Sequence, residues 1–93
     1  MTCKPRKNRR DNNQVVIVKA LRALGATVIP IEKPVDLLVG IAGVNILMEI
    51  KGENGKLTPA QVAFFEQYKG QCVVVRTVED AVECVNKIIK NRG

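Results

Sequence analysis

Two apolar segments separated by little more than Ala42-Gly43 constrain the fold of this chain more than any other feature. Residues 36–41 and 45–51 are rich in Ile, Leu and Val, and each is short enough to be a single strand. Two such runs joined by a short glycine-containing link are typical of a β-hairpin. The sequence therefore predicts an antiparallel pair of strands in the middle of the chain.

The register of this hairpin decides which side chains face each other. A loop of two or four residues pairs Leu38 with Leu47 and Asp36 with Glu49, whereas a three-residue loop would give a different pairing. Alternation along the second strand places Lys51 on the same face as Glu49. Directly opposed carboxylates repel each other and destabilise a sheet. A divalent cation between Asp36 and Glu49 would remove that conflict, so both are candidate metal ligands.

The rest of the chain alternates between helical and extended patterns. Helices are expected at about 11–24, 58–68 and 77–89, and further strands at 27–31 and 72–76. Pro30 suggests an edge strand, and the apolar run 72–76 suggests a buried one. The side chains expected to point inward from the first and last helices are Val15, Val16, Val18, Leu21, Ala23 and Leu24, and Ala81, Val82, Val85, Ile88 and Ile89.

This order, αβββαβα, predicts one α/β domain over residues 11–93, with a mixed central sheet of about four strands flanked by helices. Asp11, Asn12 or Asn13 is expected to cap the first helix. The sequence Thr58-Pro59-Ala-Gln61 is a strong helix start, because Thr58 and Gln61 can form a capping box. The capping box accounts for Gln61 without any catalytic role.

Composition limits the chemistry that is available. The chain has 93 residues, which is one small domain, and no apolar run approaches the roughly 18 residues of a membrane span. It has no histidine, which excludes His-based triads and His-containing zinc sites. The chain has three cysteines, an odd number: Cys3, Cys72 and Cys84. We expect Cys3 to be a thiol in the tail and the other two to be small buried side chains. Unpaired cysteines indicate a reducing, cytoplasmic compartment. A metal site must then use carboxylates and carbonyls, which favours Mg²⁺ or Mn²⁺.

The net charge of +6 is concentrated at the start of the chain. Residues 1–10 contain five basic side chains and no acidic one, so we expect a flexible basic arm. Such an arm is either a solvated tail or a phosphate-binding element. Aromatic side chains are few, so recognition of nucleic acid would follow the backbone rather than the bases. The candidate DNA-binding residues are Lys4, Arg6, Lys7, Arg9 and Arg10, together with Lys56.

The acids of the hairpin suggest a reaction. Asp36 and Glu49 would supply anionic oxygens to a divalent cation, and the carbonyl of Ile50 a third ligand. Water activated there can attack a phosphodiester, and Lys51 would orient that water and stabilise the developing oxyanion. Charged residues that alternate with apolar ones also occur on any half-exposed strand, so the pattern alone favours a solvated strand face.

The joint set of residues resembles a known family. Asp36, followed after twelve residues by Glu49-Ile50-Lys51, resembles the PD-(D/E)XK nuclease signature. With Gly52 and the run Lys56-Leu-Thr-Pro-Ala-Gln61, it is similar to the virus-type replication–repair nucleases (VRR-NUC), a branch similar to archaeal-type Holliday junction resolvases. The resemblance implies a restriction-endonuclease-like fold and metal-dependent cleavage of branched or structured DNA.

The resemblance also implies particular residues and partners. Asp36, Glu49 and Lys51 would form the catalytic core, with Gln61 near it. The first helix of such nucleases often carries an acidic active-site residue, for which Asp11 and Gln14 are the candidates here. The resemblance to this family also suggests a phage source, with action in the host cytoplasm.

Two classes of function follow from these features. The first is a Mg²⁺- or Mn²⁺-dependent DNA endonuclease, and the alternative is a non-catalytic nucleic-acid-binding module that uses the basic arm. A chain of this size is too small to hold a four-way junction and place two cuts, so the first class implies a homodimer. Phe64 and Phe65 are consecutive, and one of them is a candidate for the subunit interface. No membrane partner is expected.

Overall fold

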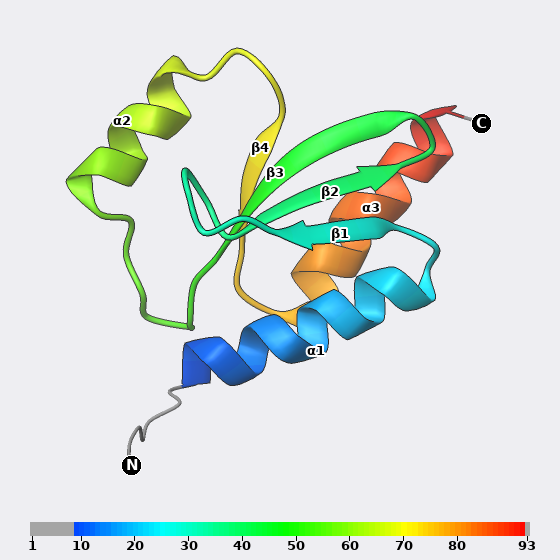
Figure 1. The fold of residues 1–93 in the computed structure, drawn as a ribbon, viewed down its shortest axis with the longest axis horizontal. Coiled ribbons are helices and arrows are strands. Elements are labelled where there is room, and N and C mark those ends of the chain that lie inside the picture. The colour runs from blue at the N-terminus through cyan, green and yellow to red at the C-terminus, as the bar shows by residue number, and fades with distance from the viewer. Residues whose placement is uncertain (1–8, 93) are drawn as a thin grey trace.

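The computed structural model describes residues 9–92, and the side chains of residues 13–91. It consists of three helices and one sheet of four strands, which confirms the α/β class (Figure 1). The elements in chain order are α1 (Arg9–Ala23), β1 (Thr27–Pro30), β2 (Leu37–Ile41), β3 (Val44–Ile50), α2 (Pro59–Gln67), β4 (Cys72–Val75) and α3 (Val78–Arg92).

Helix α1 begins at Arg9, two residues earlier than the expected start at Asp11. Arg9 and Arg10 therefore belong to the first helical turn rather than to an arm. The three expected N-cap candidates, Asp11, Asn12 and Asn13, all lie inside the helix, so that expectation is wrong. The other cations expected in the arm, Lys4, Arg6 and Lys7, lie outside the described residues.

The sheet is mixed, as predicted, with the strand order β1-β2-β3-β4. The first three strands are antiparallel neighbours, and β4 runs parallel to β3. β1 lies at one edge, where Pro30 is tolerated. β4 lies at the other edge, so the expected buried strand is wrong: within β4 only Val75 is buried.

The predicted hairpin register is confirmed. Leu38 pairs with Leu47 and Ile41 with Val44, which leaves Ala42-Gly43 as a two-residue turn. Both turn residues have positive φ, 54° for Ala42 and 77° for Gly43. This is the turn geometry that matches the twist of a hairpin, and glycine adopts it at no steric cost.

Helices α1 and α3 pack on one face of the sheet and enclose the core. Ile17 and Leu21 of α1 and Ala81 and Val85 of α3 are buried. They meet the buried strand residues Val28, Leu37, Val39, Ile46, Met48, Ile50 and Val75. The apolar side chains on this face are thus removed from water, which is the main stabilising contribution to such a domain.

Several side chains expected to point inward are exposed instead. Val15, Val16 and Leu24 are 65%, 47% and 40% exposed, and Ile89 is 41% exposed. Residues 15–18 are four consecutive apolar residues, so their side chains are distributed around the whole circumference of α1. The periodicity therefore did not identify Ile17 as the buried residue. The sheet decides which face of the helix is covered.

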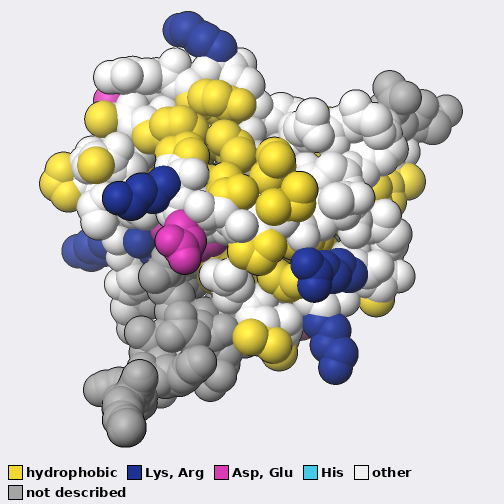
Figure 2. Space-filling view, in the orientation of Figure 1, with side chains coloured by type: hydrophobic (Ala, Val, Ile, Leu, Met, Phe, Trp, Pro, Cys, Tyr) yellow, Lys and Arg dark blue, Asp and Glu magenta, His cyan; other side chains and the backbone are white. Residues whose placement is uncertain are grey.

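Helix α2 is built differently from the other two helices. No residue of α2 is buried, although the helix carries Phe64 and Phe65. Figure 1 shows it apart from α1 and α3. Figure 2 shows hydrophobic side chains gathered on the side of the molecule where α2 lies and on toward the centre of the view. Leu38 and Leu47 of the uncovered sheet face are only half-buried.

The two cysteines among the described residues, Cys72 and Cys84, are half-buried rather than buried. Burial raises the pKa of the Cys84 thiol, against an opposing effect of the nearby Lys87 charge. A thiol whose pKa is raised stays protonated near neutral pH and is a poor nucleophile. No helix within residues 9–92 is long and apolar enough to cross a membrane.

The exposed and buried faces of α1 can be told apart by substitution. Ile17→Ala should lower the free energy of unfolding by about 2–5 kcal/mol, because it leaves a cavity at a fully buried position. Val15→Ala should change it by no more than about 0.5 kcal/mol. Urea unfolding followed by circular dichroism measures both values. Equal losses would contradict an orientation of α1 in which Ile17 is buried and Val15 is exposed.

Candidate active site

Asp36 and Glu49 lie opposite each other where the β2–β3 ladder ends. Asp36 precedes β2 by one residue, and Glu49 is next to last in β3. The backbone N–H of Asp36 donates to Oε1 of Glu49 at 3.2 Å, and the N–H of Ile50 donates to Oδ2 of Asp36 at 2.9 Å. Each carboxylate therefore accepts a hydrogen bond from the backbone of the opposite strand.

Both carboxylates are nearly excluded from solvent, with Asp36 7% and Glu49 1% exposed. Burying a carboxylate is costly unless hydrogen bonds and opposite charges compensate it. The backbone N–H groups supply part of that compensation. Lys51 supplies more, because its Nζ lies 3.4 Å from Oε2 of Glu49. The lysine is itself largely buried, at 12% exposed.

Gln61 forms the predicted capping box and also contacts Glu49. Its Oε1 accepts from the backbone N–H of Thr58 at 3.0 Å, and its own N–H donates to Thr58 Oγ1 at 3.2 Å, which completes the capping box. Its Nε2 donates to Oε2 of Glu49 at 2.9 Å. A side-chain amide has both a donor and an acceptor, so one side chain both caps α2 and contacts the buried acid.

The ligands available at this site are all oxygens. The side chains of Asp36 and Glu49 and the carbonyl of Ile50 are hard donors, and Mg²⁺ commonly binds through one or two carboxylates and several waters. Among the described residues there is no group of three or more His, Cys, Asp or Glu side chains that could hold a metal ion. By their chemistry, two carboxylates and a carbonyl fit a Mg²⁺ or Mn²⁺ site and do not fit a site for a soft metal.

The remaining predicted residues have different positions. Gln14 is half-buried and lines a surface hollow of about 420 Å³ beside α1. The side chain of Asp11 is outside the described part of the chain. Lys56 is exposed on the segment between β3 and α2. The other residues that line the hollow are Val15, Val18, Lys19, Arg22 and Pro30.

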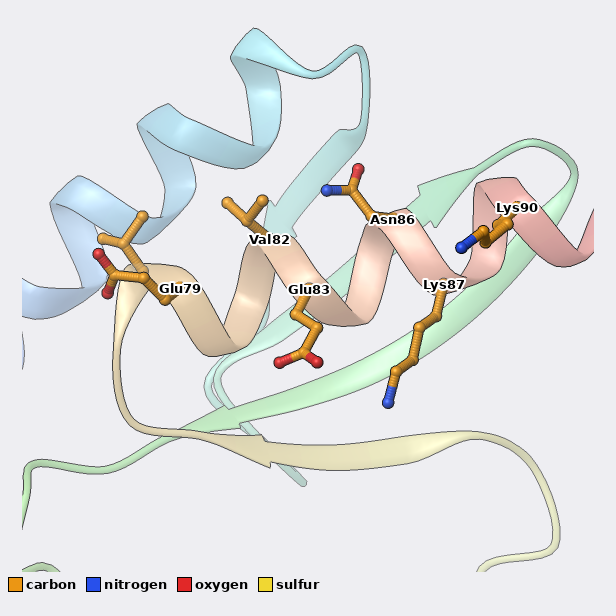
Figure 3. Close-up of a pocket in the computed structure, with 7 residues that line it drawn as sticks. Glu79, Val82, Glu83, Asn86, Lys87 and Lys90 are labelled. Carbon is orange, nitrogen blue, oxygen red and sulfur yellow. The ribbon is translucent and has the colours of Figure 1, made fainter.

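A larger hollow, of about 670 Å³, lies along the outer side of α3 (Figure 3). Glu83 and Lys87 lie one turn apart on this helix, at a spacing typical of solvated ion pairs. None of the candidate site residues lines it; the lining residues are Val78, Glu79, Val82, Glu83, Asn86, Lys87 and Lys90. We therefore do not place the site there.

One residue near the site was not predicted from the sequence. Arg76 directly follows β4, and its Nη1 donates to the carbonyls of Gly52 and Gly55, both at 2.7 Å. These carbonyls lie in the segment that follows Lys51. A single arginine after an apolar strand gives no sequence signal for this contact, because backbone carbonyls carry no residue-specific pattern.

In comparisons with known proteins, no family model matches this chain, and neither a curated protein nor a solved structure matches it. The resemblance to the VRR-NUC branch thus depends on the motif residues themselves. In the structure, Lys51 and Gln61 both contact Oε2 of Glu49.

The hydrogen bonds of Asp36 predict how its variants fold. Asp36→Ala should destabilise the metal-free protein by about 1–3 kcal/mol, because the buried N–H of Ile50 loses its acceptor. Asp36→Asn keeps an acceptor oxygen and removes a charge facing Glu49, so its stability should stay close to that of the wild type. Urea unfolding in the presence of a chelator measures both. Equal losses in the two variants would contradict the hydrogen-bonding role.

Proposed function

We propose that this protein is a Mg²⁺- or Mn²⁺-dependent DNA endonuclease with a restriction-endonuclease-like fold that hydrolyses phosphodiester bonds in branched or structured DNA. The observation that carries the proposal is the buried pair of carboxylates, Asp36 and Glu49, together with the contacts that Lys51 and Gln61 make with Glu49. A solvated strand face would leave these acids in water. Here Asp36 and Glu49 are buried together, and a lysine lies against one of them.

Each residue has a chemical role in this proposal. A divalent cation, when bound, makes water acidic enough to attack phosphorus and neutralises charge on the phosphate. Asp36, Glu49 and the Ile50 carbonyl would hold the cation. Lys51 would orient the attacking water and donate to the developing oxyanion. Gln61 holds the orientation of the Glu49 carboxylate through its hydrogen bond.

Contacts with the DNA backbone would come from cations outside the carboxylate pair. Lys56 is exposed on the segment that leads from Lys51 to α2, so its ammonium group is accessible to a DNA phosphate. The basic residues at the start of the chain, Lys4, Arg6, Lys7, Arg9 and Arg10, would add sequence-independent affinity.

The central test is metal-dependent cleavage by matched variants. The wild type should cut a four-way junction only with Mg²⁺ or Mn²⁺, and Asp36→Asn, Glu49→Gln and Lys51→Met should each lower the rate by about 100-fold or more. Glu83→Gln and Lys87→Met, on the outer side of α3, are the controls. A gel assay on junction, flap, nicked and linear duplex DNA measures the rates.

Two results of this assay would reject the proposal. Cleavage that survives in Asp36→Asn and Glu49→Gln would point to a contaminating nuclease. DNA binding without cleavage of any substrate, with either metal, would instead support the non-catalytic nucleic-acid-binding module.

The proposed enzyme acts as a homodimer, and the exposed side of α2 is the proposed contact. Val62 and Tyr68 are 40% and 42% exposed, and Phe64 stacks on Tyr68 with ring centroids 5.0 Å apart. Glu66 is the one charged residue in α2, so this apolar helix offers no cation to a DNA phosphate. Two cuts in a symmetric junction need two sites, which a second copy of the chain supplies.

Oligomeric state tests this contact. The wild-type chain should sediment as a dimer, and Val62→Glu as a folded monomer, because a charge on each subunit would be buried at the contact. Val15→Glu places the same charge on an exposed position of α1 and should leave the dimer intact. Analytical ultracentrifugation measures the masses. A monomeric wild type, or dissociation by both variants, would contradict α2 as the interface.

A further inference from the structure

Arg76 connects two parts of the chain that are far apart in sequence. Its Nη1 donates to the carbonyl of Gly52, 24 residues away, and to that of Gly55, 21 residues away. Both hydrogen bonds are 2.7 Å long and partly buried. The contact therefore fixes the turn that follows β3, where the N–H of Gly55 also donates to the carbonyl of Gly52 at 3.1 Å.

The fixed turn begins at the residue after Lys51. The backbone N–H of Lys51 donates to the carbonyl of Val75 at 3.1 Å, and Val75 directly precedes Arg76. Val75 therefore holds the backbone at Lys51, and Arg76 holds the turn that follows it. The side chain of a lysine has four rotatable bonds, and the position of its backbone limits where the ammonium group can reach. Arg76 thus helps to keep Nζ of Lys51 beside Glu49.

The same segment also leads to α2. Since no residue of α2 is buried, the core does not fix the position of this helix. Gln61, in the first turn of α2, donates to Glu49 of β3, and the segment between Gly52 and Thr58 connects these two elements. The side chain of Arg76 ties this segment to the end of β4 through the carbonyls of Gly52 and Gly55.

The position of Arg76 is itself fixed by two helices. Its backbone N–H donates to Oδ2 of Asp80 in α3 at 2.9 Å, and its carbonyl accepts from Nδ2 of Asn13 in α1 at 3.0 Å. Figure 1 shows the link between β4 and α3 passing close to α1. The guanidinium group therefore extends from the rigid part of the molecule.

From these contacts we infer that Arg76 is a positioning residue for the carboxylate site: it sets the placement of Lys51 and Gln61 through the carbonyls of Gly52 and Gly55. The effect of Arg76 on the cleavage rate rests on the proposed nuclease activity. Its effect on the position of residues 52–61 does not.

The test compares Arg76→Ala with Arg22→Ala in the full-length chain. Arg22 is a matched control, because its Nη2 also donates to a backbone carbonyl, that of Val28 at 2.9 Å, between α1 and β1. Arg76→Ala should speed amide hydrogen exchange at Gly55 and Gln61 and lower kcat by about tenfold or more. Affinity for junction DNA and its salt dependence should not change. Arg76→Lys should recover part of the rate, since its ammonium group can still donate to carbonyls.

Each other outcome overturns the inference. Unchanged exchange at Gly55 and Gln61 would show that Arg76 does not hold the segment, and this measurement decides even if the wild type cuts no DNA and the proposed function fails. Faster exchange with an unchanged kcat would show that Arg76 only stabilises the segment and does not position the site. Weaker binding with a smaller salt slope would make Arg76 a phosphate ligand instead. An equal loss of kcat in Arg22→Ala would show a general loss of stability.

Discussion

The backbone hydrogen bonds that the carboxylates of Asp36 and Glu49 accept across the hairpin are the constraint on which the rest of the structure depends. Two neighbouring buried carboxylates would ordinarily oppose folding, because each loses hydration and each repels the other. Here each acid accepts a backbone N–H from the opposite strand. The hairpin can therefore end with two acids rather than a further apolar pair. Lys51 and Gln61 both contact Glu49, so the polar part of the molecule is organised around this one residue.

Glu49 also marks the boundary between two modes of stabilisation. Its neighbours Met48 and Ile50 belong to the core that α1 and α3 enclose. Helix α2 buries no residue and is linked to the sheet by polar contacts through Gln61 and the preceding segment. The apolar core and the buried hydrogen bonds of the two acids therefore stabilise the fold, whereas the placement of Lys51 and Gln61 also depends on residues 52–61. Changes in residues 52–61 can alter the site while the core stays folded.

The features that the sequence predicted correctly depend on local chemistry. The hairpin register follows from alternation and from a two-residue turn at Ala42-Gly43, and the start of α2 follows from a capping box that spans four residues. The features that it did not predict depend on contacts distant in sequence. Ile17 is buried because of where the sheet lies, and β4 is half-exposed because it lies at an edge of the described sheet. Arg76 acts on carbonyls more than twenty residues away, which no local pattern shows.

The identity of residue 61 shows how the local and distant requirements combine. A capping box accepts either Glu or Gln at this position, because only an acceptor oxygen is needed there. The contact with Glu49 needs a donor as well, and only the amide of Gln61 provides both. A glutamate would complete the capping box and bring a second carboxylate against that of Glu49. The helix start restricts this position to glutamate or glutamine, and the buried carboxylate of Glu49 favours the glutamine.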